Sequence, residues 1–143
     1  VDENNTRQRP IMIHRAPFGS MERFIGIIIE HFAGEFPAWL SPVQVMLIPV
    51  ADTHNEYAQQ VAAELKKYGF RAQVDAGKGR MQKKIRDARE DYIPYMCIVG
   101  DRDIENGTVS VRLRTDEDLG AISVQDFIAL MNRVVADKAL ELK

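Results

Sequence analysis

Basic side chains are concentrated in one stretch of the sequence. Lys78, Arg80, Lys84 and Arg86 lie close together, and grouped cationic side chains can bind the phosphates of a nucleic acid. The alternative is a solvated helix face without a ligand. The bulk charge favours no nucleic-acid or membrane partner, because 19 Lys and Arg against 21 Asp and Glu leave a formal charge of −2. Any such site must therefore be local.

Arg112 lies in a segment of strict alternation. Apolar residues at 109, 111 and 113 alternate with polar residues at 110, 112 and 114, a pattern typical of a strand with one face in solvent. Arg112 is expected on that exposed face, where an arginine usually does no more than keep the protein soluble. Its planar set of donors nevertheless suits a bidentate contact with the edge of a guanine.

Arg23 follows a Gly19-Ser20 pair at the expected start of a helix. A guanidinium and the free backbone amides of a first helical turn can together bind a phosphate. Ser20 is equally suited to cap that helix, and the two roles are compatible. The simpler interpretation of Arg23 is a solvated helix arginine.

Histidine and cysteine give no complete metal site. His14, His31 and His54 have no spacing that would complete a site, and His14 is expected to lie in a short apolar strand. The single cysteine, Cys97, can form no intramolecular disulfide and no cysteine-rich zinc site, and we expect a buried, unreactive thiol. This cysteine usage fits a reducing, cytoplasmic location.

Two elements are expected before residue 37. Residues 9–16 (RPIMIHRA) predict a strand, and residues 20–33 predict an apolar helix that Gly34 ends. The most apolar run, residues 24–29, is bounded by charged side chains and is too short to span a membrane, so no membrane partner is expected. The Pro-rich residues 37–42 cannot continue a helix and predict a linker.

From residue 43 onward, strands and helices alternate. Strands are expected at 43–48, 70–74, 95–99 and 108–114, and helices at about 53–68, 81–89 and 123–135. Thr53 with Glu56 reads as a capping box, and Asn106-Gly107 as a turn between two extended segments. The order β-α-β-α-β-β-α predicts an α/β fold, with a mixed, mostly parallel sheet covered by about three helices.

Two sets of motifs resemble a known family. Residues 9–16 and 18–23 (FGSMER) resemble the third signature motif of class II aminoacyl-tRNA synthetases, in the form found in threonyl-tRNA synthetases. Residues 36–45, 84–86, 99–101 and 109–114 resemble the anticodon-binding domain of the same enzymes. The resemblance implies three parts: residues 1–36 as a strand-helix remnant of the catalytic domain, 37–42 as a linker, and 43–143 as an anticodon-binding domain.

The resemblance also implies roles for particular residues. Arg23 corresponds to the arginine that holds the phosphates of ATP during adenylate formation, with Ser20 and Gly19 lining the same site. His14 corresponds to a zinc-binding histidine whose companion ligands, a cysteine and a histidine, belong to a region upstream of this chain. ATP with Mg2+ and one Zn2+ are therefore expected in the full-length enzyme, and none bound to this portion alone.

Anticodon contacts are implied at four positions. Arg112 corresponds to the arginine that reads the anticodon, and Lys84 and Arg86 match basic positions of the family. Asp103 stands where the family commonly has a glutamate. Gly77 to Gly79 (GKG) replace a common Arg-Asn-Glu, so that no base contact carries over to Lys78.

The function implied is that of the C-terminal part of a class II synthetase that activates threonine with ATP and transfers it to tRNA(Thr). The partner of this part is the tRNA anticodon loop, and it is expected to be inactive alone. A homodimer is expected for the full-length enzyme, and a monomer or an artificial dimer for this chain.

Three alternatives remain open at this point. One is a stand-alone RNA-binding or regulatory module built on the same domain. Another is the equivalent portion of a prolyl, glycyl or histidyl enzyme. The third is a flavodoxin-like small-molecule domain, against which stands the absence of a glycine-rich phosphate loop at residues 51–54.

Overall fold

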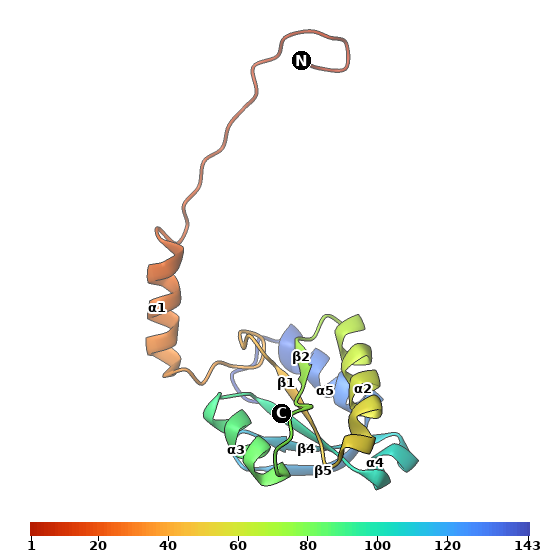
Figure 1. Ribbon diagram of the computed structural model, residues 1–143. Coiled ribbons are helices and arrows are strands. Elements are labelled where there is room, and N and C mark those ends of the chain that lie inside the picture. Colours follow the sequence, from red (N-terminus) through yellow and green to blue (C-terminus); the bar gives the residue numbers. More distant parts are fainter.

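Five strands form one mixed sheet in the computed structural model, which describes residues 1–143 (Figure 1). The strands are β1 (Val45–Pro49), β2 (Ala72–Val74), β3 (Tyr95–Val99), β4 (Thr108–Leu113) and β5 (Asp118–Ser123), in the spatial order β2-β1-β3-β4-β5. β1 pairs in parallel with β2 and β3, whereas β4 is antiparallel to β3 and β5. β1 and β3 are almost entirely buried, as expected for strands covered on both faces.

Helices cover both faces of the sheet. α2 (Asn55–Lys67) and α5 (Val124–Ala136) pack on one face, and α3 (Met81–Glu90) packs on the other. The first face holds a core of 20 buried residues, and the second holds a smaller cluster of 5. A short 3-10 helix η1 (Asp52–His54) precedes α2, and α4 (Asp101–Asn106) joins β3 to β4. The expected α/β class with a mixed sheet is confirmed, with two parallel and two antiparallel strand pairs.

Two local expectations were wrong, and one strand was missed. Asn106-Gly107 is the end of α4, with Gly107 as its left-handed cap, and not a turn between two extended segments. β5 was not expected, because Asp118 and Gly120 interrupt any alternation of apolar residues. Thr53 does not cap α2, because residues 52–54 form η1 and His54 occupies the capping position without a side-chain bond.

The N-terminal part of the chain stands apart from the sheet. α1 (Met21–Phe32) has no buried residue, and residues 1–20 form neither helix nor strand (Figure 1). The strand expected at residues 9–16 is therefore absent, and Ile11 and Met12 are 92% and 87% exposed. An extended segment needs a neighbouring strand for its backbone hydrogen bonds, and the chain supplies none. No helix here combines the length and the apolar character that crossing a membrane requires.

The segment predicted as a linker packs onto the domain. Pro37, Ala38 and Ser41 are buried. The Arg71 guanidinium donates from Nε to the carbonyl of Ser41 (2.9 Å) and from Nη2 to that of Trp39 (3.0 Å). The Gln44 side-chain amide donates to the Ala38 carbonyl at 2.9 Å. Residues 37–41 are therefore fixed by the domain that follows them.

Candidate nucleic-acid interface

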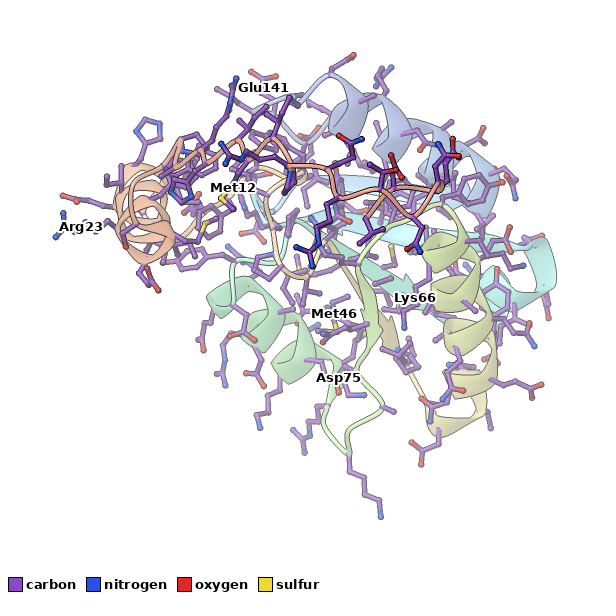
Figure 2. The ribbon with its side chains drawn as sticks, turned by 90° about the horizontal axis from the view of Figure 1, so that it is seen from above. Met12, Arg23, Met46, Lys66, Asp75 and Glu141 are labelled. Carbon is purple, nitrogen blue, oxygen red and sulfur yellow. The ribbon has the colours of Figure 1, made fainter.

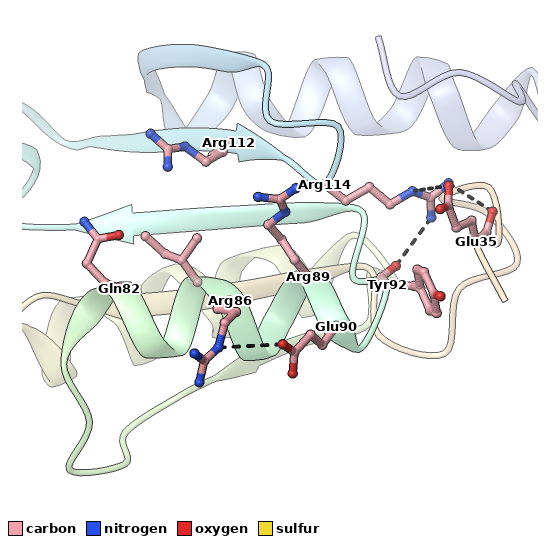
Figure 3. Close-up of a pocket in the computed structure, with 9 residues that line it drawn as sticks. Glu35, Gln82, Arg86, Arg89, Glu90, Tyr92, Arg112 and Arg114 are labelled. Atoms are coloured by element: carbon pink, nitrogen blue, oxygen red, sulfur yellow. Dashed lines mark hydrogen bonds and ion pairs between the residues drawn. The ribbon is translucent and has the colours of Figure 1, made fainter.

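A hollow of about 430 Å³ lies between α3 and the end of β4 (Figure 3). Four arginines, two glutamates, one glutamine, Ile85 and Tyr92 line it. The arginines are Arg86, Arg89, Arg112 and Arg114, and the hollow is called the arginine pocket below. The lining brings four guanidinium groups together with the carboxylates of Glu35 and Glu90. Three aspartates outside the lining also pair with these arginines: Asp87 with Arg86, Asp116 with Arg89 and Asp118 with Arg112.

Arg112 has donors that its neighbours leave free. It stands on β4 opposite Met96 of β3 and Asp118 of β5, and its side chain is 34% exposed. One guanidinium nitrogen, Nη2, lies 3.5 Å from the Asp118 carboxylate, and the buried Nε has no hydrogen-bond partner. The placement on a partly open strand face agrees with the alternating pattern. A planar group with unused donors at the edge of a pocket is suited to a ligand that carries acceptors.

Two further arginines come from α3. Ile85 and Ala88 turn toward the sheet and belong to the smaller core cluster, so that Arg86 and Arg89, three residues apart, share the outer side of the helix. Arg86 makes only long ion pairs, at 3.6 Å to Glu90 and 3.8 Å to Asp87. Arg89 is held closely by Asp116 at 2.6 Å. Arg86 is therefore the more available of the two for an outside anion.

Lys84 does not join the arginine pocket. Its side chain is 8% exposed, and Nζ donates to the Asp75 carbonyl at 2.7 Å, with the Asp75 carboxylate at 3.8 Å. It borders a second hollow of about 310 Å³, together with Lys78, Arg80 and the end of β1. Lys84 and Arg86, expected to act together, thus face different hollows, because neighbouring helical positions point in different directions. Much of the charge of Lys84 is already balanced within the chain.

Asp103 has an internal role in the structure. It is buried in the first turn of α4, where one carboxylate oxygen accepts from the Gly100 amide at 3.1 Å. The other oxygen accepts from the hydroxyls of Thr108 (3.0 Å) and Ser110 (3.1 Å) on β4. Both oxygens are thus occupied, and Asp103 ties α4 to β4.

Burial shifts the pKa values of several groups in and near the sheet. Burial raises the pKa of Cys97, and the negative charge of Asp103 adds to the effect. Burial also raises the pKa of Tyr57, again with a smaller contribution from Asp103. Cys97 is fully buried, so it is placed as expected for an unreactive thiol. Burial lowers the pKa of Arg114, and the negative charge of Glu35 partly offsets this decrease.

Arg114, Arg89 and Gln82 also line the pocket, although the sequence analysis gave none of them a role in a site. Arg114 lies two residues beyond Arg112 in the same alternating segment, and Arg89 lies three residues beyond Arg86. Both spacings predict a shared face, so that each residue could have been inferred from its predicted neighbour. Arg114 donates to the carbonyls of Phe36, Glu35 and Tyr92, and Figure 3 shows the contacts with Glu35 and Tyr92.

The candidate residues of the N-terminal part are not in the pocket. Ser20 caps α1 by accepting from the Arg23 amide at 3.4 Å, and its hydroxyl donates to Glu22 at 2.7 Å, which lowers the pKa of Glu22. Gly19 has a φ of +66° in the turn before the helix. The Arg23 side chain points away from the domain (Figure 2). His14 is exposed, and no group of three ligating side chains that could hold a metal is present.

Residues 44–133 match the family model described as an anticodon binding domain. The fold and the family model agree, and the chain belongs to the anticodon-binding domain family.

Relatives of this chain are threonine-tRNA ligases. The enzyme of Desulforamulus reducens is 48% identical over 140 residues, which are 98% of this chain and 22% of that protein. The enzyme of Thermus thermophilus is 47% identical over 141 residues, covering 99% of this chain and 21% of that protein. The chain thus spans about a fifth of the length of these curated relatives, and it is recognisable as their anticodon-binding portion.

Solved structures agree with this placement. The RNA-binding domain of threonyl-tRNA synthetase from Cryptosporidium parvum superposes with a TM-score of 0.76 at 30% identity, covering 80% of this chain and 29% of that one. Prolyl-tRNA synthetase from the same organism, complexed with halofuginone and AMPPNP, gives a TM-score of 0.63 at 24% identity, covering 71% of this chain and 22% of that one. The second likeness concerns the fold alone.

Proposed function

We propose that this chain binds the anticodon loop of tRNA(Thr) as the anticodon-binding part of a threonine-tRNA ligase. The observation that carries the proposal is the arginine pocket, in which the partly exposed guanidinium of Arg112, held only by a 3.5 Å bond to Asp118, lies beside the accessible Arg86. Protein domains read RNA sequence chiefly in single-stranded loops, whose bases expose hydrogen-bonding edges. An anticodon loop offers such edges and phosphates together.

The pocket residues divide between two kinds of contact. Arg112, fixed on a strand, is proposed to donate to the acceptors of an anticodon guanine. Arg86, on the outer side of α3 with only weak ion pairs, is proposed to bind a phosphate and to position the loop without reading it. Lys84 and Asp103 remain predicted contacts, and each would first have to give up internal hydrogen bonds.

A binding titration tests this division. The ligands are a tRNA(Thr) anticodon stem-loop and one altered at its second and third anticodon bases, each at two salt concentrations. Arg112→Ala should abolish the preference for the cognate loop, worth about 1–3 kcal/mol for a bidentate base contact. Arg86→Ala should weaken both loops equally and reduce the salt slope by about one unit.

Arg133→Ala is the matched control, because Arg133 is exposed on α5, the helix that packs on the opposite face of the sheet. It should bind both loops as the original chain does. Equal, weak and merely salt-dependent binding of both loops by the original chain would contradict the proposal.

The activity of the whole enzyme is a second part of the proposal. The ligase that contains this part would activate threonine with Mg2+-bound ATP, and Arg23, Ser20 and Gly19 would contribute to the ATP site. Arg23 stands in the first turn of α1, where a guanidinium and backbone amides can both meet phosphate. The chain alone should show no threonine-dependent pyrophosphate exchange, and measurable exchange would contradict this expectation.

Zinc does not fit the residues present here. His14 is the single proposed ligand, and the structure brings no other ligating side chains together with it. Any zinc site would have to be completed by residues outside this chain. We therefore expect no stoichiometric zinc to survive dialysis of this chain against a weak chelator.

A further inference from the structure

Glu35 forms one end of the arginine pocket, and it lies in the short segment that joins α1 to the domain. Arg114, which directly follows β4, donates from Nη1 to the Phe36 carbonyl at 2.6 Å and from Nη2 to the Glu35 carbonyl at 3.0 Å. Nη1 is also 3.4 Å from the Tyr92 carbonyl. A planar guanidinium can hold consecutive carbonyls in one fixed geometry, which a lysine ammonium cannot do. We call these contacts the Arg114 clamp.

The chain turns sharply between α1 and the clamp. α1 ends at Phe32, and the next two residues, Ala33 and Gly34, have φ values of +50° and +83°. A Cβ atom on Gly34 would lie 3.3 Å from the ring of Tyr92, the residue whose carbonyl faces Arg114. The turn thus packs closely against the wall that the clamp holds.

The one further contact of α1 also ends at the clamp: the ring of Phe32 packs edge-to-face on that of Phe36, with the ring centroids 5.9 Å apart. None of its residues is buried, and it projects away from the sheet (Figure 1). The direction of α1 relative to the domain is therefore determined by the turn at residues 33–34 and by the clamp at residues 35–36. Such short segments at the end of a helix are where hinge motions are absorbed.

We infer that Arg114 is a positioning residue, which fixes the direction of α1 and couples it to RNA bound in the arginine pocket. The inference rests on the proposed RNA binding. Arg112 lies on β4 and Arg114 lies two residues later, just past the end of that strand, and both border the pocket together with Glu35. We call the clamp closed when Arg114 makes these hydrogen bonds. In this closed form, the guanidinium of Arg114 and the pocket wall at Glu35 are held in place for an anionic ligand. RNA therefore binds the closed form more tightly, and by reciprocity it stabilises that direction of α1.

Distance measurements on the full chain test the inference. Spin labels are attached at Glu30→Cys on α1 and Lys66→Cys on α2, both exposed positions, whereas Cys97 is buried and stays unlabelled. The chain with Arg114 intact should give one narrow distribution of distances between the two labels. Arg114→Met should broaden it at least about twofold and weaken stem-loop binding by about fivefold or more, a typical size for coupling between sites.

Two further variants separate positioning from charge. Arg114→Lys keeps the charge and loses the planar fork, so it should broaden the distribution while retaining part of the affinity. Gly34→Ala keeps Arg114, but its new Cβ meets the Tyr92 ring at a φ of +83°, so it should shift the distribution. Gly26→Ala is the matched control, because a Cβ there has nothing within 4 Å, and it should leave the distances unchanged.

The outcomes are distinguishable. The inference is overturned if the original chain already shows the broad distribution of Arg114→Met, or if Arg114→Met loses RNA affinity with unchanged distances. It is also overturned if added stem-loop narrows the distribution of Arg114→Met as much as that of the original chain. If the original chain binds no stem-loop, the proposed function fails, and the distances in the free chain still decide whether Arg114 orients α1.

Discussion

Residues 1–34 and residues 35–143 have similar kinds of apolar side chains and very different surroundings. In the first region Ile11, Ile13 and Ile27 are 92%, 75% and 62% exposed, whereas in the second Leu47 and Ile48 are fully buried. The second region closes its own core with five strands and the helices on both faces. The first region has local structure alone, a helix with a serine cap. Local signals are enough to form a helix, but a strand depends on partners at a distance in the sequence.

The largest expected difference between the two regions is in the effect of removing a large aliphatic side chain. Leu47→Ala, in the middle of β1, should lower the free energy of unfolding by about 2–5 kcal/mol, because it leaves a cavity in the main core. Ile27→Ala, at an exposed position of α1, should change it by less than about 0.5 kcal/mol. Urea unfolding followed by circular dichroism measures both. A comparable loss in the two variants would mean that α1 is packed against the domain in solution.

A pair of carboxylates gives a sharper comparison. Asp103 and Glu22 both lie in the first turn of a helix and both accept from a hydroxyl, but Asp103 is buried and Glu22 is exposed. Asp103→Ala should cost about 1–3 kcal/mol, because it leaves buried donors unsatisfied. Glu22→Ala should have little effect on the unfolding of the domain.

The stem-loop titration, repeated on Asp103→Ala, separates stability from recognition. If Asp103 only ties α4 to β4, the folded variant should keep its preference for the cognate loop. A loss of that preference, with unchanged stability, would show instead that Asp103 contacts a base.

The expected effect that is smallest at neutral pH is a dependence of stability on pH. Burial raises the pKa of Cys97 in the folded protein above its ordinary value, which is about 8.5 in an unfolded chain. Above that pH the unfolded chain releases a proton that the folded protein keeps, so stability is complete below about pH 8.5 and decreases as the pH rises. The free energy of unfolding should then decrease by up to about 1.4 kcal/mol per pH unit.

Unfolding measured between pH 8 and 10 checks this dependence, with Cys97→Ala as the control that should lose this part of the slope. Tyr95, whose pKa burial also raises, begins to contribute above its ordinary pKa of about 10. An equal slope in both proteins below that pH would assign the effect to other groups.

The sheet was largely predictable because its buried strands are dense in apolar residues. β1 and β3 are short apolar runs, and the alternation at 109–113 identified β4 and its open face. β5 could not be predicted, since its partner β4 stabilises a segment whose own pattern is irregular. α4 has six residues between Gly100 and Gly107, too few to show helical periodicity.

The site was only partly predictable, for a related reason. Sequence spacing placed Arg112 on the open face of its strand and Arg86 on the outer face of its helix, and both line the pocket. It could not show that the Asp75 carbonyl holds Lys84, because that contact depends on the path of the loop between β2 and α3. The clamp of Arg114 joins residues 78 and 79 positions apart, a distance over which no periodicity operates.

The edges of the sheet also bear on how the protein behaves at high concentration. β2, at one edge, is only three residues long. β5, at the other edge, carries Asp118, and its register with β4 shifts between Val111 and Arg112. Short strands, irregular pairing and edge charges discourage one sheet from continuing into another. Neither edge is therefore a good template for pairing with a second copy. Any self-association should come instead from the exposed isoleucines of residues 1–34, such as Ile11, Ile13 and Ile27.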